Sequence, residues 1–262
     1  MSCPRCGDEI LEPVVGRDAA GIIVSWLHYC RIQPDASRRL CRNCLGRLSP
    51  REQNEILDRD YILGDIPRAL WDNCFGRWDS GGDARMDDLR AQCLKCAADP
   101  PRMFSLIGET GRGKTFSVVS ILQEYMLERS RPWEVHRGGW RLGKFCSARS
   151  LLVEIRRTFD THDDTEADII EDLARRELLV LDDIFHRQRD VSAKDMAFEA
   201  RILYDVLDRR INAGKSTIVT SNRSLASIAD IDDALVSRMR LGPIIIMDST
   251  FPDRRPGSIV NL

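Results

Sequence analysis

The fold is decided by the stretch Met103-Phe104-Ser105-Leu106-Ile107-Gly108-Glu109-Thr110-Gly111-Arg112-Gly113-Lys114-Thr115. An apolar strand runs into a glycine-rich turn that ends in Lys-Thr, and an amphipathic helix from Phe116 to about Glu128 is expected to follow. This order of strand, loop and helix is what the phosphate-binding motif G-x-x-x-x-G-K-[ST] requires. The competing interpretation is a glycine-rich surface turn with a chance Lys-Thr.

A loop of this type binds phosphates through its backbone and side chains together. The glycines let the N–H groups converge on one point, and the N-terminus of the helix adds partial positive charge there. Lys114 can reach the β- and γ-phosphates, and the hydroxyl of Thr115 can bind Mg²⁺. We therefore predict ATP or GTP binding by Gly108, Glu109, Thr110, Gly111, Arg112, Gly113, Lys114 and Thr115.

The bulk composition narrows the class of protein. A chain of 262 residues has room for one large domain or two modest ones. No apolar run approaches the roughly 18–20 residues that span a bilayer, and the N-terminus lacks the apolar core of a secretory signal. A cytoplasmic protein without a membrane partner is expected. The net charge is only −2, so any contact with nucleic acid must come from a local patch.

Two Cys-x-x-Cys pairs near the N-terminus predict a metal site. Each pair resembles a zinc knuckle, and two knuckles supply the four thiolates of a tetrahedral structural Zn²⁺. Free buried or redox-active cysteines are the alternative, and His28 or Cys30 could replace one ligand. A third pair, Cys93 and Cys96, lies in a predicted helix and is assigned to packing. The predicted zinc ligands are Cys3, Cys6, Cys41 and Cys44.

Further strands downstream end in polar residues suited to ATP hydrolysis. The fully apolar run Leu178–Leu181 leads into Asp182 and Asp183. Acids at the carboxyl end of a parallel strand face the crevice where α/β folds bind ligands. Asp182 would bind Mg²⁺ through water, and Asp183 would orient or deprotonate the attacking water.

The next strand, residues 216–223, ends in Asn222, which could reach the γ-phosphate and its water. A strand-terminating Asn in a turn is the alternative. Arg238 precedes the last apolar strand, Ile244–Met247, and is either an exposed helix residue or an arginine finger that acts on the nucleotide of a neighbouring subunit.

The segment from Arg131 to Arg157 is basic, because it contains seven Lys and Arg residues but only two Glu residues. Its last three arginines are Arg149, Arg156 and Arg157, on a predicted helix. The interpretations are a nucleic-acid contact or a solvated helix face.

These elements in this order resemble the AAA+ ATPases, and specifically the DnaC/IstB family of helicase loaders and transposition helpers. Other matching segments are Ile66–Trp71 with Phe75 and Trp78, Lys144–Leu152, Leu203–Ile211, Thr220-Ser221-Asn222 and Ser237-Arg238-Met239. In relatives the first segment lies near the base pocket, the fourth is sensor 1, and the last is the arginine-finger box. The resemblance covers residues 66 to 247.

The resemblance implies a five-stranded parallel AAA+ sheet without a C-terminal lid, and a slow, partner-stimulated ATPase that forms an ATP-dependent homo-oligomer with Arg238 acting in trans. It also implies that single-stranded DNA runs along the helices after the second strand, where Arg149, Arg156 and Arg157 lie. The domain at residues 1–60 would dock on a hexameric replicative helicase, and residues 61–262 would be the ATPase.

The resulting hypothesis is a loader that places a replicative helicase on single-stranded DNA with ATP, Mg²⁺ and a structural Zn²⁺. The alternatives are an IstB-type transposition helper and a non-hydrolysing, nucleotide-switched DNA-binding adaptor. A zinc-dependent transcription factor would leave most of the chain unexplained.

Overall fold

Five strands form one parallel sheet in the part of the chain that the computed structural model describes, which comprises residues 65–129, 142–159, 165–186 and 192–254. The strands are β1 (Met103–Gly108), β2 (Gly143–Ser147), β3 (Leu178–Ile184), β4 (Ser216–Ser221) and β5 (Ile244–Met247). Their order is β2-β3-β4-β1-β5, and each neighbouring pair is parallel. The predicted five-stranded parallel α/β sheet is confirmed.

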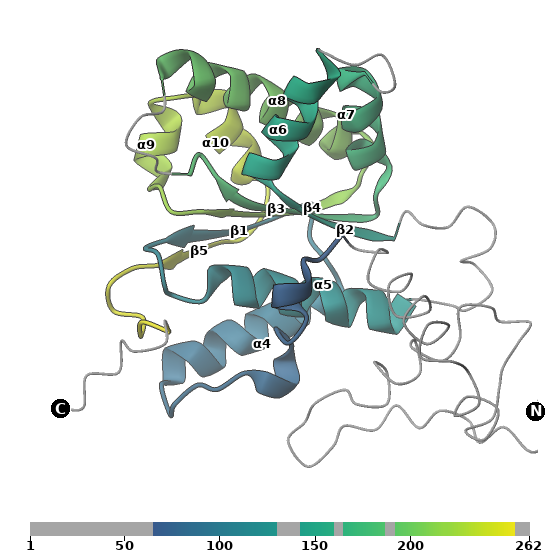
Figure 1. The fold of residues 1–262 in the computed structure, drawn as a ribbon. Coiled ribbons are helices and arrows are strands. Elements are labelled where there is room, and N and C mark those ends of the chain that lie inside the picture. Colours follow the sequence, from purple (N-terminus) through teal and green to yellow (C-terminus); the bar gives the residue numbers. More distant parts are fainter. Residues whose placement is uncertain (1–64, 130–141, 160–164, 187–191, 255–262) are drawn as a thin grey trace, which may run out of the picture.

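Helices cover both faces of this sheet (Figure 1). One face carries α4 (Ala84–Ala98) and α5 (Lys114–Arg129), preceded by the 3-10 turns η2 (Arg68–Leu70) and η3 (Phe75–Arg77). The other face carries α6 (Ala148–Thr158), α7 (Glu166–Arg175), α8 (Ala193–Asn212), α9 (Leu225–Ala229) and α10 (Asp233–Met239). Because both faces are covered, the central strands β1, β3 and β4 are buried along almost their whole length.

Successive residues of each central strand enter two separate cores. Met103 and Ile107 of β1 pack in the core beneath α8 and α10, whereas Phe104 and Leu106 pack against α5. This alternation is the period of two that a strand imposes on its side chains. Cys93 and Cys96 are buried in the second core, which confirms their assignment to packing.

The sheet topology brings the predicted site residues to one edge. Because all five strands are parallel, their carboxyl ends lie at the same edge of the sheet. The loop follows β1, the two acids lie near the end of β3, and Asn222 follows β4, which lies between β1 and β3. The three segments are therefore neighbours in space although they are far apart in sequence.

Several predictions concern residues outside the described part. The zinc ligands Cys3, Cys6, Cys41 and Cys44 and the domain boundary near Tyr61 all precede residue 65. Within the described ranges, no group of three or more His, Cys, Asp or Glu side chains could hold a metal ion. No helix of these ranges combines the length and apolar character needed to cross a membrane.

Candidate nucleotide-binding site

The glycine-rich loop closes tightly against the end of β5. Gly108 has φ +156°, and a Cβ atom at this position would lie 1.9 Å from the carbonyl oxygen of Met247. The next residue, Glu109, donates its N–H to the same carbonyl at 3.0 Å. Gly113 has φ +92°, a conformation that other residues rarely adopt. Glycine is therefore required at both ends of the loop.

Lys114 lies at the start of α5 and is only 6% exposed. Its ammonium donates to the carbonyls of Gly108 at 2.8 Å and Glu109 at 2.7 Å, and to Oδ1 of Asn222 at 2.7 Å. Burial lowers the pKa of Lys114 to about 8, while the charges of Asp183 and Asp182 act in the opposite direction. The ammonium of Lys114 is thus bound to carbonyls of the glycine-rich loop and to Asn222 at the end of β4.

Asp182 and Thr115 place oxygen atoms side by side. The Thr115 hydroxyl donates to the Asp182 carboxylate at 3.1 Å, and Thr220 of β4 donates to Oδ1 of Asp182 at 2.7 Å. Burial raises the pKa of Asp182, against the effect of these two hydrogen bonds. Carboxylate and hydroxyl oxygens are the ligands that Mg²⁺ prefers.

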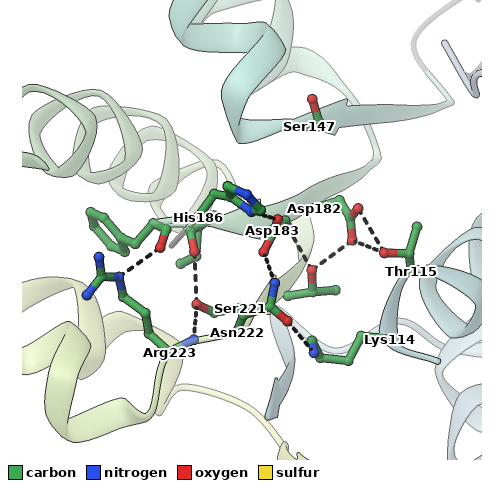
Figure 2. Close-up of polar contacts among 12 residues, drawn as sticks. Lys114, Thr115, Ser147, Asp182, Asp183, His186, Ser221, Asn222 and Arg223 are labelled. Carbon is green, nitrogen blue, oxygen red and sulfur yellow. Dashed lines mark hydrogen bonds and ion pairs between the residues drawn. The ribbon is translucent and has the colours of Figure 1, made fainter. Parts of the chain in front are cut away.

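The turn after Asp182 departs from regular strand geometry. Adjacent residues of a strand point to opposite faces, so a regular β3 would separate the side chains of Asp182 and Asp183. Asp183 instead has φ +57°, and the pairing of β3 with β4 shifts register between Leu181 and Ile184. Both carboxylates consequently line the same cavity (Figure 2).

Asn222 joins the lysine to the second acid. Its Nδ2 donates to Oδ1 of Asp183 at 2.5 Å, while its Oδ1 accepts from Lys114. Figure 2 shows the resulting row of side chains from Lys114 through Asn222 to Asp183. Lys114 follows the loop after β1, Asn222 follows β4, and Asp183 lies near the end of β3, as the sequence predicted, although their chemical roles stay predictions.

His186 is a neighbour of Asp183 that sequence reasoning missed. Its Nδ1 is hydrogen-bonded to Oδ2 of Asp183, and its side chain lines the same cavity. In the sequence, His186 is marked only as a polar residue three positions after Asp183, and this spacing by itself does not predict that the two residues share a site. The positive φ angles of Asp183 and Phe185 produce the contact.

The cavity has a volume of about 580 Å³ and an aromatic wall beside the loop. Trp78 lines it and packs against Phe75 and Phe116, with ring centroids 5.8 and 5.6 Å apart. The indole N–H of Trp78 is buried and has no partner among the described residues. A flat apolar surface next to a phosphate-binding loop is suited to a nucleotide base.

Arg254 reaches the cavity from the C-terminal side and was not predicted. Its backbone N–H donates to the carbonyl of Gly111 at 2.8 Å, which holds the segment after β5 against the loop. Its Nε and Nη2 atoms are buried without a hydrogen-bond partner in the described residues. Unpaired buried donors are costly, so this guanidinium is poised for an anion in the cavity.

Arg238 does not line the cavity of its own chain. It lies in α10, where Nη2 donates to the Tyr204 hydroxyl at 2.5 Å and to Oδ1 of Asp208 at 2.6 Å. Its guanidinium carbon lies 3.8 Å from the centre of the Tyr204 ring. The sequence predicts either an exposed helix residue or an arginine finger, and neither prediction includes this ion pair with Asp208 of α8.

The predicted DNA-binding arginines lie together on α6. Arg149, Arg156 and Arg157 are all exposed, but Arg156 forms an ion pair with Asp195 of α8 at 2.5 Å. Phe159, immediately after α6, is 64% exposed and lies 6.4 Å from Phe198 between ring centroids. The helix therefore presents arginines beside an exposed aromatic ring.

Comparisons with solved structures identify the fold. The chain is similar to DnaI, with 15% identity over 71% of this chain and 95% of that chain and a TM-score of 0.51. It is similar to the DnaC helicase loader, with 17% identity over 69% and 99% and a TM-score of 0.50. The fold is the AAA+ fold of these proteins.

A third similar structure is a proposed primosome component from Streptococcus pyogenes serotype M3. It shares 16% identity over 73% of this chain and 93% of that chain, with a TM-score of 0.52. No protein-family model and no curated protein matches the sequence. At these identities the likeness establishes the AAA+ fold, as the sequence resemblance predicted, and leaves the function to the site.

Proposed function

We propose that this AAA+ protein is an ATPase that loads a replicative helicase onto single-stranded DNA. The observation that carries the ATPase part is the row Lys114–Asn222–Asp183 beside the Thr115–Asp182 pair, in a single cavity of nucleotide size. The fold shared with the DnaC helicase loader supports the loader part.

Nucleotide binding would use the loop and its lysine. The phosphates would accept hydrogen bonds from the backbone N–H groups of residues 108–115, and Lys114 would exchange a loop carbonyl for a phosphate oxygen. The buried nitrogens of Arg254 would contact the same anion from the opposite side. Trp78 would pack against the base.

The adjacent oxygens of Thr115 and Asp182 fit Mg²⁺, and these two residues would hold it, Asp182 through water. The bound ion would neutralise the charge of the phosphates during hydrolysis. The protein's own residues would do the rest of the chemistry.

Asp183 would accept a proton from the attacking water. At the same time the water oxygen would bond to the γ-phosphorus, and ADP would leave. Asn222 would keep the carboxylate oriented, because it donates to one oxygen of Asp183 while its own oxygen is held by Lys114.

Arg238 would complete the site of a neighbouring subunit in an ATP-dependent homo-oligomer. Arg238 does not line the cavity of its own chain, which supports this role, and its contacts with Asp208 and Tyr204 would have to open. Arg238→Ala should bind ATP normally, and its rate of ATP hydrolysis should fall at least about 100-fold. Mixing it with a Lys114→Ala subunit, which supplies the finger, should restore turnover; the absence of rescue would contradict action in trans.

Partner binding would use two further regions. The arginines of α6 and the exposed Phe159 would contact the backbone and a base of single-stranded DNA. The N-terminal 60 residues would bind Zn²⁺ through Cys3, Cys6, Cys41 and Cys44 and dock on the helicase. One zinc per chain, lost when Cys41 and Cys44 are replaced by Ser, is the expected result of metal analysis.

The test of the whole proposal is ATP hydrolysis by purified protein with and without single-stranded DNA and a hexameric replicative helicase. DNA-stimulated turnover and a helicase complex that is lost on deleting residues 1–60 are expected. A rate of ATP hydrolysis that does not change when helicase is added would favour a transposition helper. Tight ATP binding without turnover would favour a nucleotide-switched adaptor.

A further inference from the structure

The end of β3 and the turn that follows it are held in an unusual backbone conformation. Asp183 has φ +57° and Phe185 has φ +51°, a region that residues with a side chain rarely adopt. Two such residues within three positions carry a conformational cost, which persists only where surrounding contacts impose the conformation. The contacts around this turn therefore indicate what it positions.

Three side chains fix the backbone of the turn from neighbouring elements. The Glu199 carboxylate of α8 accepts the N–H of Phe185 at 2.6 Å, and Arg223 donates from Nε to the Phe185 carbonyl at 2.8 Å. Ser221 donates to the carbonyl of Ile184 at 2.9 Å. Glu199 is acidic but only 7% exposed, and it does not line the cavity. Its evident role is to hold this turn.

The residue that the turn directs toward the cavity is His186. Its Nδ1 contacts Oδ2 of Asp183, while Asn222 donates to the other oxygen, Oδ1 (Figure 2). A carboxylate can only accept hydrogen bonds, so the hydrogen in the first contact is on Nδ1. The Asp183 carboxylate is thus held between two donors.

This arrangement matters because the Lys114 ammonium can compete with the attacking water for the Asp183 carboxylate. The charges of Lys114 and Asp183 interact across the cavity. A carboxylate held by Asn222 alone could change its χ1 rotamer and pair with the ammonium. Such an ion pair would remove the base from the water and the lysine from the phosphates.

We propose that His186 is a positioning residue for Asp183, which keeps the carboxylate directed at the attacking water. The proposal rests on the hydrolytic function proposed above and adds a residue to it. His186 need not touch the nucleotide; it acts through the Nδ1–Oδ2 hydrogen bond, and Glu199 and Arg223 keep it in place.

The kinetic test compares two substitutions with the wild type. His186→Ala removes the donor and should lower kcat about 10-fold to 100-fold with the dissociation constant for ATP unchanged within about two-fold. His186→Asn places an amide N–H near the position of Nδ1 and should recover most of the lost rate. An unchanged kcat in His186→Ala, or no recovery in His186→Asn, would overturn the proposal.

A spectroscopic readout is independent of turnover. The chain has four histidines, so ¹⁵N imidazole signals can be assigned by comparison with His186→Asn. His186 should carry its hydrogen on Nδ1 in the nucleotide-free protein, and Asp183→Ala should return it to the common Nε2–H tautomer. A signal unaffected by Asp183→Ala would overturn the contact itself.

The two proposals fail in different ways. Wild-type protein that binds ATP without turnover would overturn both hydrolysis and the positioning role. Normal turnover in both wild type and His186→Ala would overturn the role of His186 alone and leave the ATPase proposal standing.

Discussion

Two buried cations, Arg210 and Lys114, lie at opposite ends of the same sheet, and they differ in what surrounds them. Arg210 of α8 is fully buried at the amino ends of β3 and β4. It donates to the carbonyls of Leu173 at 2.6 Å and Arg176 at 2.7 Å, and to the Thr217 hydroxyl at 2.8 Å. Further carbonyl contacts come from Ala174, Glu177 and Ser216.

Lys114 at the carboxyl edge is as well bonded but faces a different environment. Arg210 ties α7, β3 and β4 together and lines neither of the two cavities described here. Lys114 borders a cavity with two carboxylates, positive φ angles and the unpaired nitrogens of Arg254. Burial of a cation therefore does not distinguish structure from function, whereas strained and unsatisfied surroundings do.

Cavity volume does not make the distinction either. A second cavity of about 610 Å³ lies near Arg210 and is slightly larger than the one at the loop. Its charged residues are already paired, as in Arg175 with Glu171 at 2.5 Å and Lys215 with Glu177 at 2.6 Å. This cavity offers no unpaired charge to a ligand, and we assign no function to it.

The largest effect on stability is expected from Arg210→Ala. The substitution leaves several buried carbonyls without a donor and should lower the free energy of unfolding by about 3–5 kcal/mol. The neighbouring Arg209→Ala, which loses only a half-exposed ion pair with Glu171, should cost less than about 1 kcal/mol. Denaturant unfolding measures both, and equal losses would remove the structural role given to Arg210.

Lys114→Ala should show the opposite behaviour. ATP affinity should fall on the order of 100-fold or more, about 2.8 kcal/mol, because the phosphates lose their cation. Stability should change less than in Arg210→Ala, because Lys114 donates three hydrogen bonds whereas Arg210 donates six. Calorimetric titration with ATP, with the exposed Lys95→Ala as control, tests this; wild-type affinity in Lys114→Ala would refute the phosphate-loop assignment.

Arg254→Ala tests whether unsatisfied nitrogens mark a binding residue. Loss of one contact to the anion should weaken ATP binding about 10-fold, without the loss of stability expected for Arg210→Ala. The exposed Arg240→Ala is the matched control. If Arg254→Ala instead destabilised the fold and left affinity unchanged, Arg254 would belong with Arg210 as a structural arginine.

The smallest effect concerns the buried acid Glu199. Burial raises its pKa, so the folded protein retains a proton that the unfolded chain loses from about pH 4.5 upward. Stability should therefore fall as pH rises between the unfolded and folded pKa values. Glu199→Gln keeps an acceptor for Phe185 and should lose less stability than wild type on going from pH 5 to pH 7. Identical pH dependence would contradict this cause.

Much of this site could be predicted because each part is a local pattern. The glycine-rich loop after β1, the acids near the end of β3 and Asn222 after β4 all lie at the carboxyl ends of buried strands, and parallel strands bring such ends together. Even here the boundary of α5 was misplaced, because the helix begins at Lys114 rather than Phe116. The loop and the first helical turn share these residues.

The remaining site residues depend on three-dimensional contacts. His186 faces Asp183 only because the backbone adopts positive φ angles that Glu199 and Arg223 stabilise from other elements. Arg254 reaches the cavity because the segment after β5 folds back on Gly111. No spacing in the sequence predicts either contact.

The most direct test of the account is a titration of wild-type and Lys114→Ala protein with ATP and Mg²⁺ by isothermal calorimetry. The account predicts one nucleotide bound per chain in the wild type and no measurable binding in the variant, with both proteins equally folded. Absence of binding by folded wild-type protein, or equal binding by the two, would contradict the central claim that the cavity at the carboxyl edge is a nucleotide site.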